Sequence, residues 1–131
     1  MSAENVAIVR RCYEAWNRQD ISSLRELAHP DMEVDLSARS LNPDVYRGFE
    51  RFETLIEEIG EIWEEFSFEP EKVLDAGEQV VGIVRARGLG RGSGVRAQDR
   101  IGQVWTIHDG KVARFRLYPE PADALRAAGL S

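Results

Sequence analysis

The sequence has one cysteine, two histidines and no long apolar run. The single cysteine, Cys12, rules out an internal disulfide, and nothing else indicates an oxidising compartment. His29 and His108 lack the spacing of a metal site and the partners of a catalytic dyad, so we expect no metal and no cofactor. No apolar run reaches the roughly 18 residues that span a bilayer, and no signal peptide is recognisable. We therefore expect a cytoplasmic protein that does not bind membranes.

The chain also has fewer basic than acidic residues. Lysine and arginine total 17 against 23 aspartates and glutamates, a net charge of −6, which argues against a nucleic-acid partner. Five arginines gather between residues 85 and 100, at Arg85, Arg87, Arg91, Arg96 and Arg100. Their alternation is more typical of a solvated strand face than of an anion site.

Helical periodicity dominates the first half of the chain and strand alternation the second. Val6, Val9, Tyr13 and Trp16 follow the spacing of one helix face. The expected helices cover residues 4–18, about 20–28 and 49–64, with a short last helix in the tail. The expected strands cover 32–38, 66–76, 79–90, 94–108 and 111–118, and a loop covers 39–48. We predict a single α+β domain, residues 1–131.

The pair Asp109-Gly110 between two alternating runs is the strongest local signal, because a two-residue type I′ hairpin turn needs positive φ at both positions. An uninterrupted register from this turn places Trp105 opposite Arg114. One face of the hairpin would then carry Gln103, Trp105, Arg114 and Arg116. The other face would carry Val104, Phe115 and Leu117.

A second turn centred on Gly92 would place Arg85 opposite Asp99 and extend both faces over three strands. A register slip of one residue there would reverse that pairing. The face with Trp105, Arg114 and Arg116 mixes aromatic and guanidinium groups, which is typical of protein contacts. We predict a homodimer through these three residues.

Three segments carry a family resemblance: AENVAIVRRCYEAWNRQDISSLRELAHPDMEV, VYRGFERF and VWTIHDGKVARFRLYPEPADALRAAGL. Together they resemble the SnoaL-like branch of the nuclear transport factor 2-like superfamily, which includes polyketide cyclases and ketosteroid isomerase. The resemblance implies a cystatin-like cone, in which a strongly bent antiparallel sheet wraps around three N-terminal helices and leaves a pocket. A shared fold does not by itself assign the chemistry.

The positions of the ketosteroid isomerase machinery are empty in this sequence. That chemistry needs a carboxylate base, a tyrosine and a protonated acid. Alignment places Cys12 at the tyrosine, Leu36 at the base and a residue near Gly102 at the acid. Asp35, one residue from the base position, is the best candidate base if the strand bulges, with Tyr46 or Tyr13 as hydrogen-bond donor; a solvent-facing Asp35 is the alternative.

The expected pocket is apolar. We predict that Trp16 and Trp63 border it and that Val104, Phe115 and Leu117 form its floor. Two functions remain open at this point. The first is binding of a small, mostly apolar metabolite, with or without acid–base isomerase, cyclase or hydrolase chemistry. The second is a non-catalytic homodimeric association module with a vestigial pocket.

Overall fold

The computed structural model describes residues 2–39 and 43–130, and apart from one short strand the elements follow the order expected from the sequence. The helices are α1 (Ser2–Asn17), α2 (Ile21–Leu27), α3 (Phe49–Ile62) and α4 (Pro121–Ala127). The strands are β1 (Ala28–Asp35), β2 (Val45–Arg47), β3 (Trp63–Ala76), β4 (Gln79–Gly90), β5 (Arg96–His108) and β6 (Lys111–Tyr118). No helix in these two ranges is long and apolar enough to cross a membrane.

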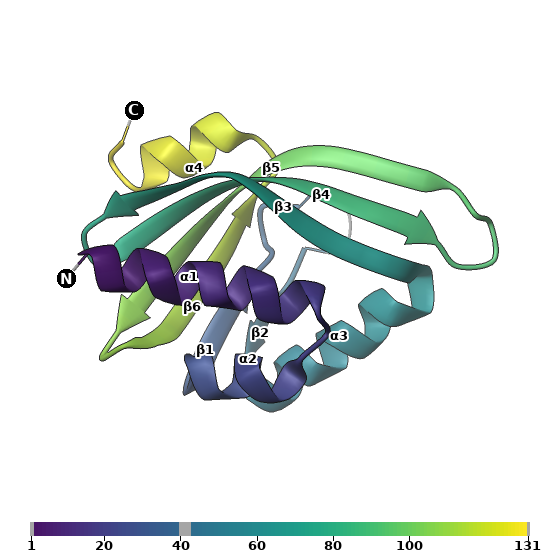
Figure 1. The fold of residues 1–131 in the computed structure, drawn as a ribbon, viewed down its shortest axis with the longest axis horizontal. Coiled ribbons are helices and arrows are strands. Elements are labelled where there is room, and N and C mark those ends of the chain that lie inside the picture. Colours follow the sequence, from purple (N-terminus) through teal and green to yellow (C-terminus); the bar gives the residue numbers. More distant parts are fainter. Residues whose placement is uncertain (1, 40–42, 131) are drawn as a thin grey trace.

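The strands form one curved sheet in the order β2-β1-β6-β5-β4-β3. β1 and β6 run parallel, and the other neighbouring pairs are antiparallel. Figure 1 shows α1, α2 and α3 below the concave face of this sheet, with α4 above its convex face. The predicted α+β cone is confirmed.

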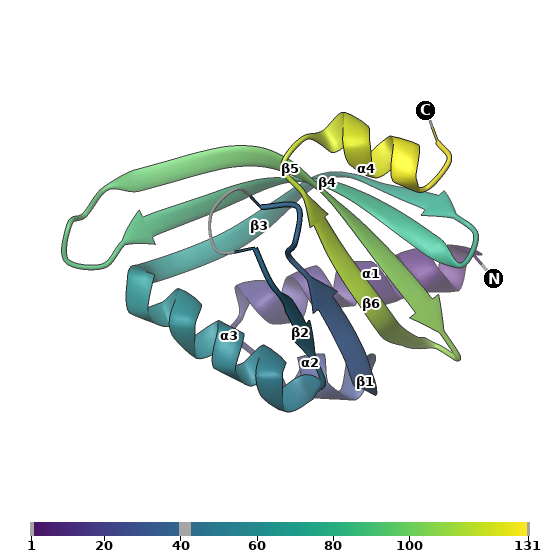
Figure 2. The ribbon, with the colours of Figure 1, turned by 180° about the vertical axis from the view of Figure 1, so that it is seen from behind.

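Two differences from the predicted elements lie in β1 and β2. β1 begins at Ala28, before Pro30, although proline cannot donate to a strand ladder. The pairing of β1 with β6 shifts between Ala28 and Glu33, so the ladder passes over the proline. β2 lies inside the expected loop 39–48, of which residues 40–42 are outside the described part of the chain. Figure 2 shows β2 at the edge of the sheet beside β1.

The β5–β6 hairpin turns where the sequence predicts, but its register does not continue as predicted. Asp109 and Gly110 have φ values of 51° and 76°, and Ile107 pairs with Val112. The register then shifts, so that Trp105 lies opposite Phe115. The predicted pairing of Trp105 with Arg114 is wrong, because a bulge adds one residue to β6 and exchanges the faces beyond it.

The β4–β5 register is also displaced by one residue from the prediction. Arg85 pairs with Arg100, and Asp99 pairs with Ala86 instead. The connection is closed by a hydrogen bond from the Gly90 N–H to the Val95 carbonyl at 2.7 Å. Arg85 and Arg100 share a carboxylate on β3: Glu71 lies 3.2 Å from Arg85 and 2.8 Å from Arg100. The predicted Arg85–Asp99 pair is therefore wrong.

Candidate functional site: an apolar cavity inside the cone

A cavity of about 130 Å³ lies between the concave face of the sheet and helices α1, α2 and α3. Its walls are almost entirely aromatic and aliphatic. The aromatic wall residues are Tyr13, Trp16, Phe49, Phe52, Phe66, Phe68, Trp105 and Phe115. The aliphatic ones include Leu24, Met32, Val34, Leu36, Leu55, Ile59 and Leu117. We call this space the inner cavity.

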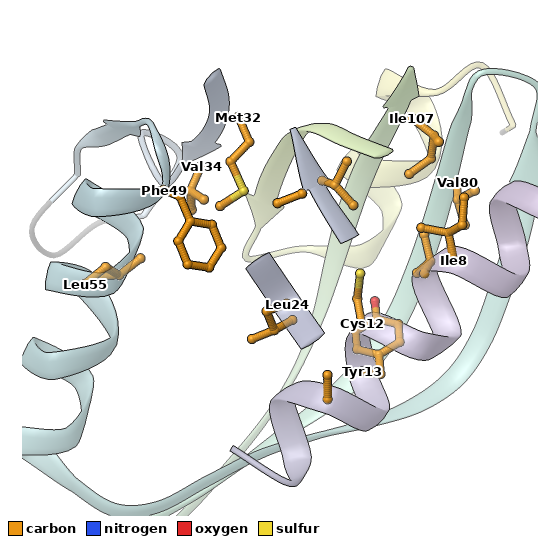
Figure 3. Close-up of a cluster of buried hydrophobic side chains, with 14 of the residues drawn as sticks. Ile8, Cys12, Tyr13, Leu24, Met32, Val34, Phe49, Leu55, Val80 and Ile107 are labelled. Carbon is orange, nitrogen blue, oxygen red and sulfur yellow. The ribbon is translucent and has the colours of Figure 1, made fainter. Parts of the chain in front are cut away.

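Strand alternation and the β6 bulge together aim these side chains inward. Val34 and Leu36 share a face of the chain around the end of β1, so both line the inner cavity, and Asp35 between them does not. The bulge puts Trp105 on the same face as Phe115, with ring centroids 4.8 Å apart. Figure 3 shows Phe49 and Leu55 of α3 facing the side chains of α1 across the core.

The predicted pocket residues divide into two groups. Trp16, Phe115 and Leu117 line the inner cavity. Val104 and Trp63 do not. Val104 lies on the convex face, where it packs with Val81, Ile83 and Ala124 beneath α4.

Trp63 instead lines a second cavity next to the inner one, and its ring rests on the backbone of β4. A β-carbon on Gly88 would lie 2.6 Å from that ring, so a residue without a side chain is needed there.

A buried chain of hydrogen bonds holds Tyr13 against the sheet. The Trp105 Nε1–H donates to the Tyr13 hydroxyl at 3.1 Å, and that hydroxyl donates to the Gln103 Oε1. Gln103 has no exposed surface, and its Nε2 has no acceptor among the described residues. Burial raises the pKa of Tyr13 well above its ordinary value, although the hydrogen bond from Trp105 opposes this. Tyr13 is therefore neutral, and its hydroxyl already forms hydrogen bonds with Trp105 and Gln103.

Cys12 also lines the inner cavity, one residue before Tyr13. The side chain is 3% exposed, and burial raises the pKa of its thiol to about 12. A thiol in this environment stays protonated at neutral pH and is a poor nucleophile. Cys12 therefore contributes an apolar surface to the cavity wall.

Asp35, the predicted base, is an ion-pair partner on the convex face. Its side chain is 7% exposed and lies 2.8 Å from Arg114 and 3.5 Å from Arg116. Burial opposes ionisation of this carboxyl, but hydrogen bonds from the Ser37 hydroxyl and N–H, then from Arg114, outweigh it and lower the pKa of Asp35. Asp35 is ionised and does not reach the inner cavity.

Tyr46, the other predicted donor, does not line the inner cavity either. Its hydroxyl lies 3.4 Å from the Glu58 carboxylate on α3, and Arg51 stacks over its ring at 5.2 Å. Tyr46 is buried, yet it is not one of the residues that line the cavity. The three predicted catalytic residues thus do not meet in one site.

The predicted dimer face is divided between the two sides of the sheet. Arg114 and Arg116 lie on the convex face beside Asp35, and Arg116 stacks on Tyr118 at 4.8 Å. Trp105 lies on the concave face in the wall of the inner cavity. A single interface through all three residues is therefore excluded by the β6 bulge, and the homodimer itself stays a prediction.

Comparison with known proteins identifies the family. A model of the SnoaL-like domain matches residues 9–115. The chain belongs to the SnoaL-like family. A comparison with curated proteins gives no match.

Solved structures similar to this SnoaL-like chain have the same fold. Bal32a, from a soil-derived mobile gene cassette, is 26% identical with a TM-score of 0.80 over 89% of each chain. An NTF2-like protein of unknown function from Burkholderia pseudomallei is 22% identical with a TM-score of 0.79, over 96% of this chain and 98% of that one. A protein of unknown function with a cystatin-like fold, from Xanthomonas campestris, is 18% identical with a TM-score of 0.77, over 86% and 88%.

The SnoaL-like cone here lacks a proton-transfer centre at the three aligned positions. Cys12 and Leu36 both line the inner cavity but carry no ionised or basic group at neutral pH. Gly102 faces α4 on the convex side, where a β-carbon would press on Ala124. Within residues 2–39 and 43–130, no three His, Cys, Asp or Glu side chains are grouped so that they could hold a metal ion.

Sequence reasoning missed Gln103 and Trp105 as part of the site, because the bulge that brings Phe115 onto the face of Trp105 leaves no sign in the alternation of β6. Two signals did exist. An amide in the middle of an apolar strand needs a buried partner, and Gly82 on the neighbouring strand leaves room for one.

Proposed function

We propose that this protein binds a neutral, mostly apolar small molecule about the size of one ring in the inner cavity. The observation that carries the proposal is the composition of the cavity wall. Apart from Arg39, the described residues around this space are apolar or aromatic, and no Asp, Glu or His belongs to this part of the wall. Water gains few hydrogen bonds in such a space, so an apolar ligand replaces it favourably.

The volume supports a ligand of this size. The inner cavity measures about 130 Å³. An engineered protein cavity of about 150 Å³, lined by similar side chains, stays dry and binds benzene. One aromatic or alicyclic ring therefore fits without rearrangement of the wall.

The protonation states of the groups in and near the cavity favour binding alone over binding with acid–base catalysis. Cys12 and Tyr13 both hold their protons at neutral pH, since burial raises both pKa values. Arg39 also lines the cavity and interacts with other groups of the protein. A general base needs a pKa near the working pH and a place beside its substrate. Asp35 has neither, because its pKa is lowered and it lies on the other face.

A thermal-shift titration with toluene, indene and cyclohexanone tests the proposal. A ligand at a hundredfold its dissociation constant stabilises the folded state by about 2.7 kcal/mol, a shift of several degrees in a domain of this size. The matched variants are Val34→Phe, which fills the inner cavity, and Val95→Phe, which adds the same ring at a position that is 60% exposed.

We expect the wild type and Val95→Phe to be stabilised by at least one of these compounds, and Val34→Phe to show no shift. The midpoint of Val34→Phe without ligand checks that it folds. Equal shifts in Val34→Phe and Val95→Phe would place binding elsewhere, and no shift in any protein would contradict the proposal.

A further inference from the structure

A second cavity of about 250 Å³ adjoins the inner one, and the two share part of their walls. Trp16, Leu24, Ile59 and Phe66 line both spaces. We call the second space the outer cavity and these four side chains the partition. The partition consists of side chains alone, which can change rotamer without breaking the fold.

The outer cavity has a mixed wall, mostly apolar but with three polar side chains that the inner cavity does not have. Besides the partition and Trp63, its wall includes Gln19 at the end of α1, Glu64 on β3 and Arg91 at the tip of the β4–β5 hairpin. The inner cavity suits an apolar ring, and the outer cavity can also accept a charged or hydrogen-bonding group at its polar side chains.

Arg91 is held in place at this wall. Its Nε donates to the Gly60 carbonyl at 2.9 Å, and its backbone N–H donates to the Ile62 carbonyl at 2.9 Å. No carboxylate lies within 4.0 Å of its guanidinium in the part of the chain that the structure describes, whereas Arg85, Arg87 and Arg100 of the same hairpin have such partners. Arg96 also has no ion pair there, but it does not line the outer cavity. An anchored guanidinium with free amino groups recognises a carboxylate well.

Trp16 in the partition also has an unpaired hydrogen-bond donor. Its indole Nε1–H is buried and has no acceptor among the described residues. A buried donor without an acceptor is unfavourable, so a ligand that supplies an acceptor to Trp16 would gain affinity. A ligand that crosses the partition and offers an oxygen lets Trp16 make this hydrogen bond.

We propose that the natural ligand is amphiphilic and occupies both cavities, with an apolar ring in the inner cavity and a carboxylate bound by Arg91 in the outer one. This inference rests on the proposed function, because it uses the inner cavity as the ring site. Together the two cavities reach the range of about 300–1,000 Å³ that is typical of ligand pockets, which the inner cavity alone does not. Glu64 on the same wall repels the carboxylate and so limits its affinity.

The test compares phenylalkanoates with matched neutral alkylbenzenes. The probes are 3-phenylpropionate, 4-phenylbutyrate and 5-phenylvalerate, each with the alkylbenzene of the same chain length, and dissociation constants are measured by calorimetry. In the wild type, we expect one carboxylate of the series to bind more tightly than its alkylbenzene.

Two variants at exposed positions test whether side-chain charge in the outer cavity affects binding of the carboxylate. Arg91→Gln should weaken the carboxylate about tenfold, the loss of a charge-assisted hydrogen bond, and leave the alkylbenzene unchanged. Glu64→Gln should tighten the carboxylate and leave the alkylbenzene unchanged. Unfolding midpoints establish that both variants fold.

The two proposals fail in different ways. If the alkylbenzenes bind the wild type but Arg91→Gln does not change the affinity of any carboxylate, the outer subsite is wrong and the inner one stands. If neither series binds the wild type, both are overturned. A weaker affinity of Arg91→Gln for both series alike would also overturn the subsite, because it would indicate a structural role for Arg91.

Discussion

The Tyr13 hydroxyl lies directly over Gly82 on β4, in the space that a side chain at residue 82 would need. This contact fixes the tyrosine at the sheet, where it joins Gln103 and Trp105. A glycine at position 82 thus leaves room for the Tyr13 hydroxyl of α1, and Tyr13, Gln103 and Trp105 form a buried hydrogen-bonded network within the apolar core.

Gly82→Ala is expected to destabilise the protein by about 1–3 kcal/mol, the usual cost of overpacking a core. In a Tyr13→Phe background the cost should fall, because the nearest remaining ring atom would lie 3.1 Å from the new β-carbon. Urea unfolding of the wild type, both single variants and the double variant measures the coupling. Equal costs of Gly82→Ala in the two backgrounds would contradict the assigned contact.

Asp35→Asn is expected to destabilise the protein by about 1–3 kcal/mol at pH 7, because Arg114 and Arg116 lose the carboxylate they share. The pKa of Asp35 is lowered from an ordinary value of 3.8, so its ionised form stabilises the fold above that pH. This contribution is lost as pH falls through the lowered pKa.

The stability difference between the wild type and Asp35→Asn should therefore be constant near neutrality and shrink below about pH 4. Urea unfolding from pH 7 to pH 2.5 measures it. Glu71→Gln is the control on the exposed β3 surface, and it should cost much less at pH 7. A difference that is independent of pH would show that the Asp35 carboxylate is not the stabilising group.

Cys12 is expected to resist thiol reagents in the folded protein. Its thiol is buried and its pKa is about 12, so very little thiolate is present or accessible at pH 8. Labelling by a disulfide reagent should follow unfolding, and an inner-cavity ligand should slow it further. The control is Ser93→Cys with Cys12→Ala, which carries its thiol on the exposed hairpin tip and should react at once. Rapid labelling of Cys12 in the folded state would contradict its burial.

Alanine substitutions at two glycines with open space around them are expected to change the stability of the protein in opposite directions. Gly60 lies within α3, and a β-carbon added there would meet nothing within 4 Å, so Gly60→Ala should stabilise the protein by about 0.5–1 kcal/mol. Gly48 precedes α3 with φ of 84°, so Gly48→Ala should destabilise it by about 1–3 kcal/mol. Thermal unfolding gives both values, and stabilisation by Gly48→Ala would contradict the backbone conformation.

Local signals in the sequence predict the fold well. The Asp109-Gly110 turn, the helix periodicity around Val9 and Trp16, and the strand alternation after α3 all lie within one element or one turn. These patterns depend on short-range geometry, so the sequence alone places the helices and the longer strands within a few residues, although it misses the short strand β2.

The candidate site is less predictable because it depends on register. One extra residue in β6 puts Arg114 on the opposite face from Trp105, and the β4–β5 register displaces Arg85 by one position. A bulge is decided by tertiary packing, here of Phe115 and Trp105 against the helices, and packing is not visible in an alternating pattern. Phe115 therefore lies in the wall of the inner cavity, while Val104, expected on the same face, lies beneath α4.

The most direct measurement is a crystal structure of the protein soaked with iodobenzene, with anomalous data to locate the iodine. The account predicts one strong iodine peak in the inner cavity, surrounded by Trp16, Phe115 and Leu117, and its disappearance in Val34→Phe crystals. A cavity that is closed by collapsed side chains, or an iodine peak found only outside the cone, would contradict the claim that this protein binds an apolar molecule at this site.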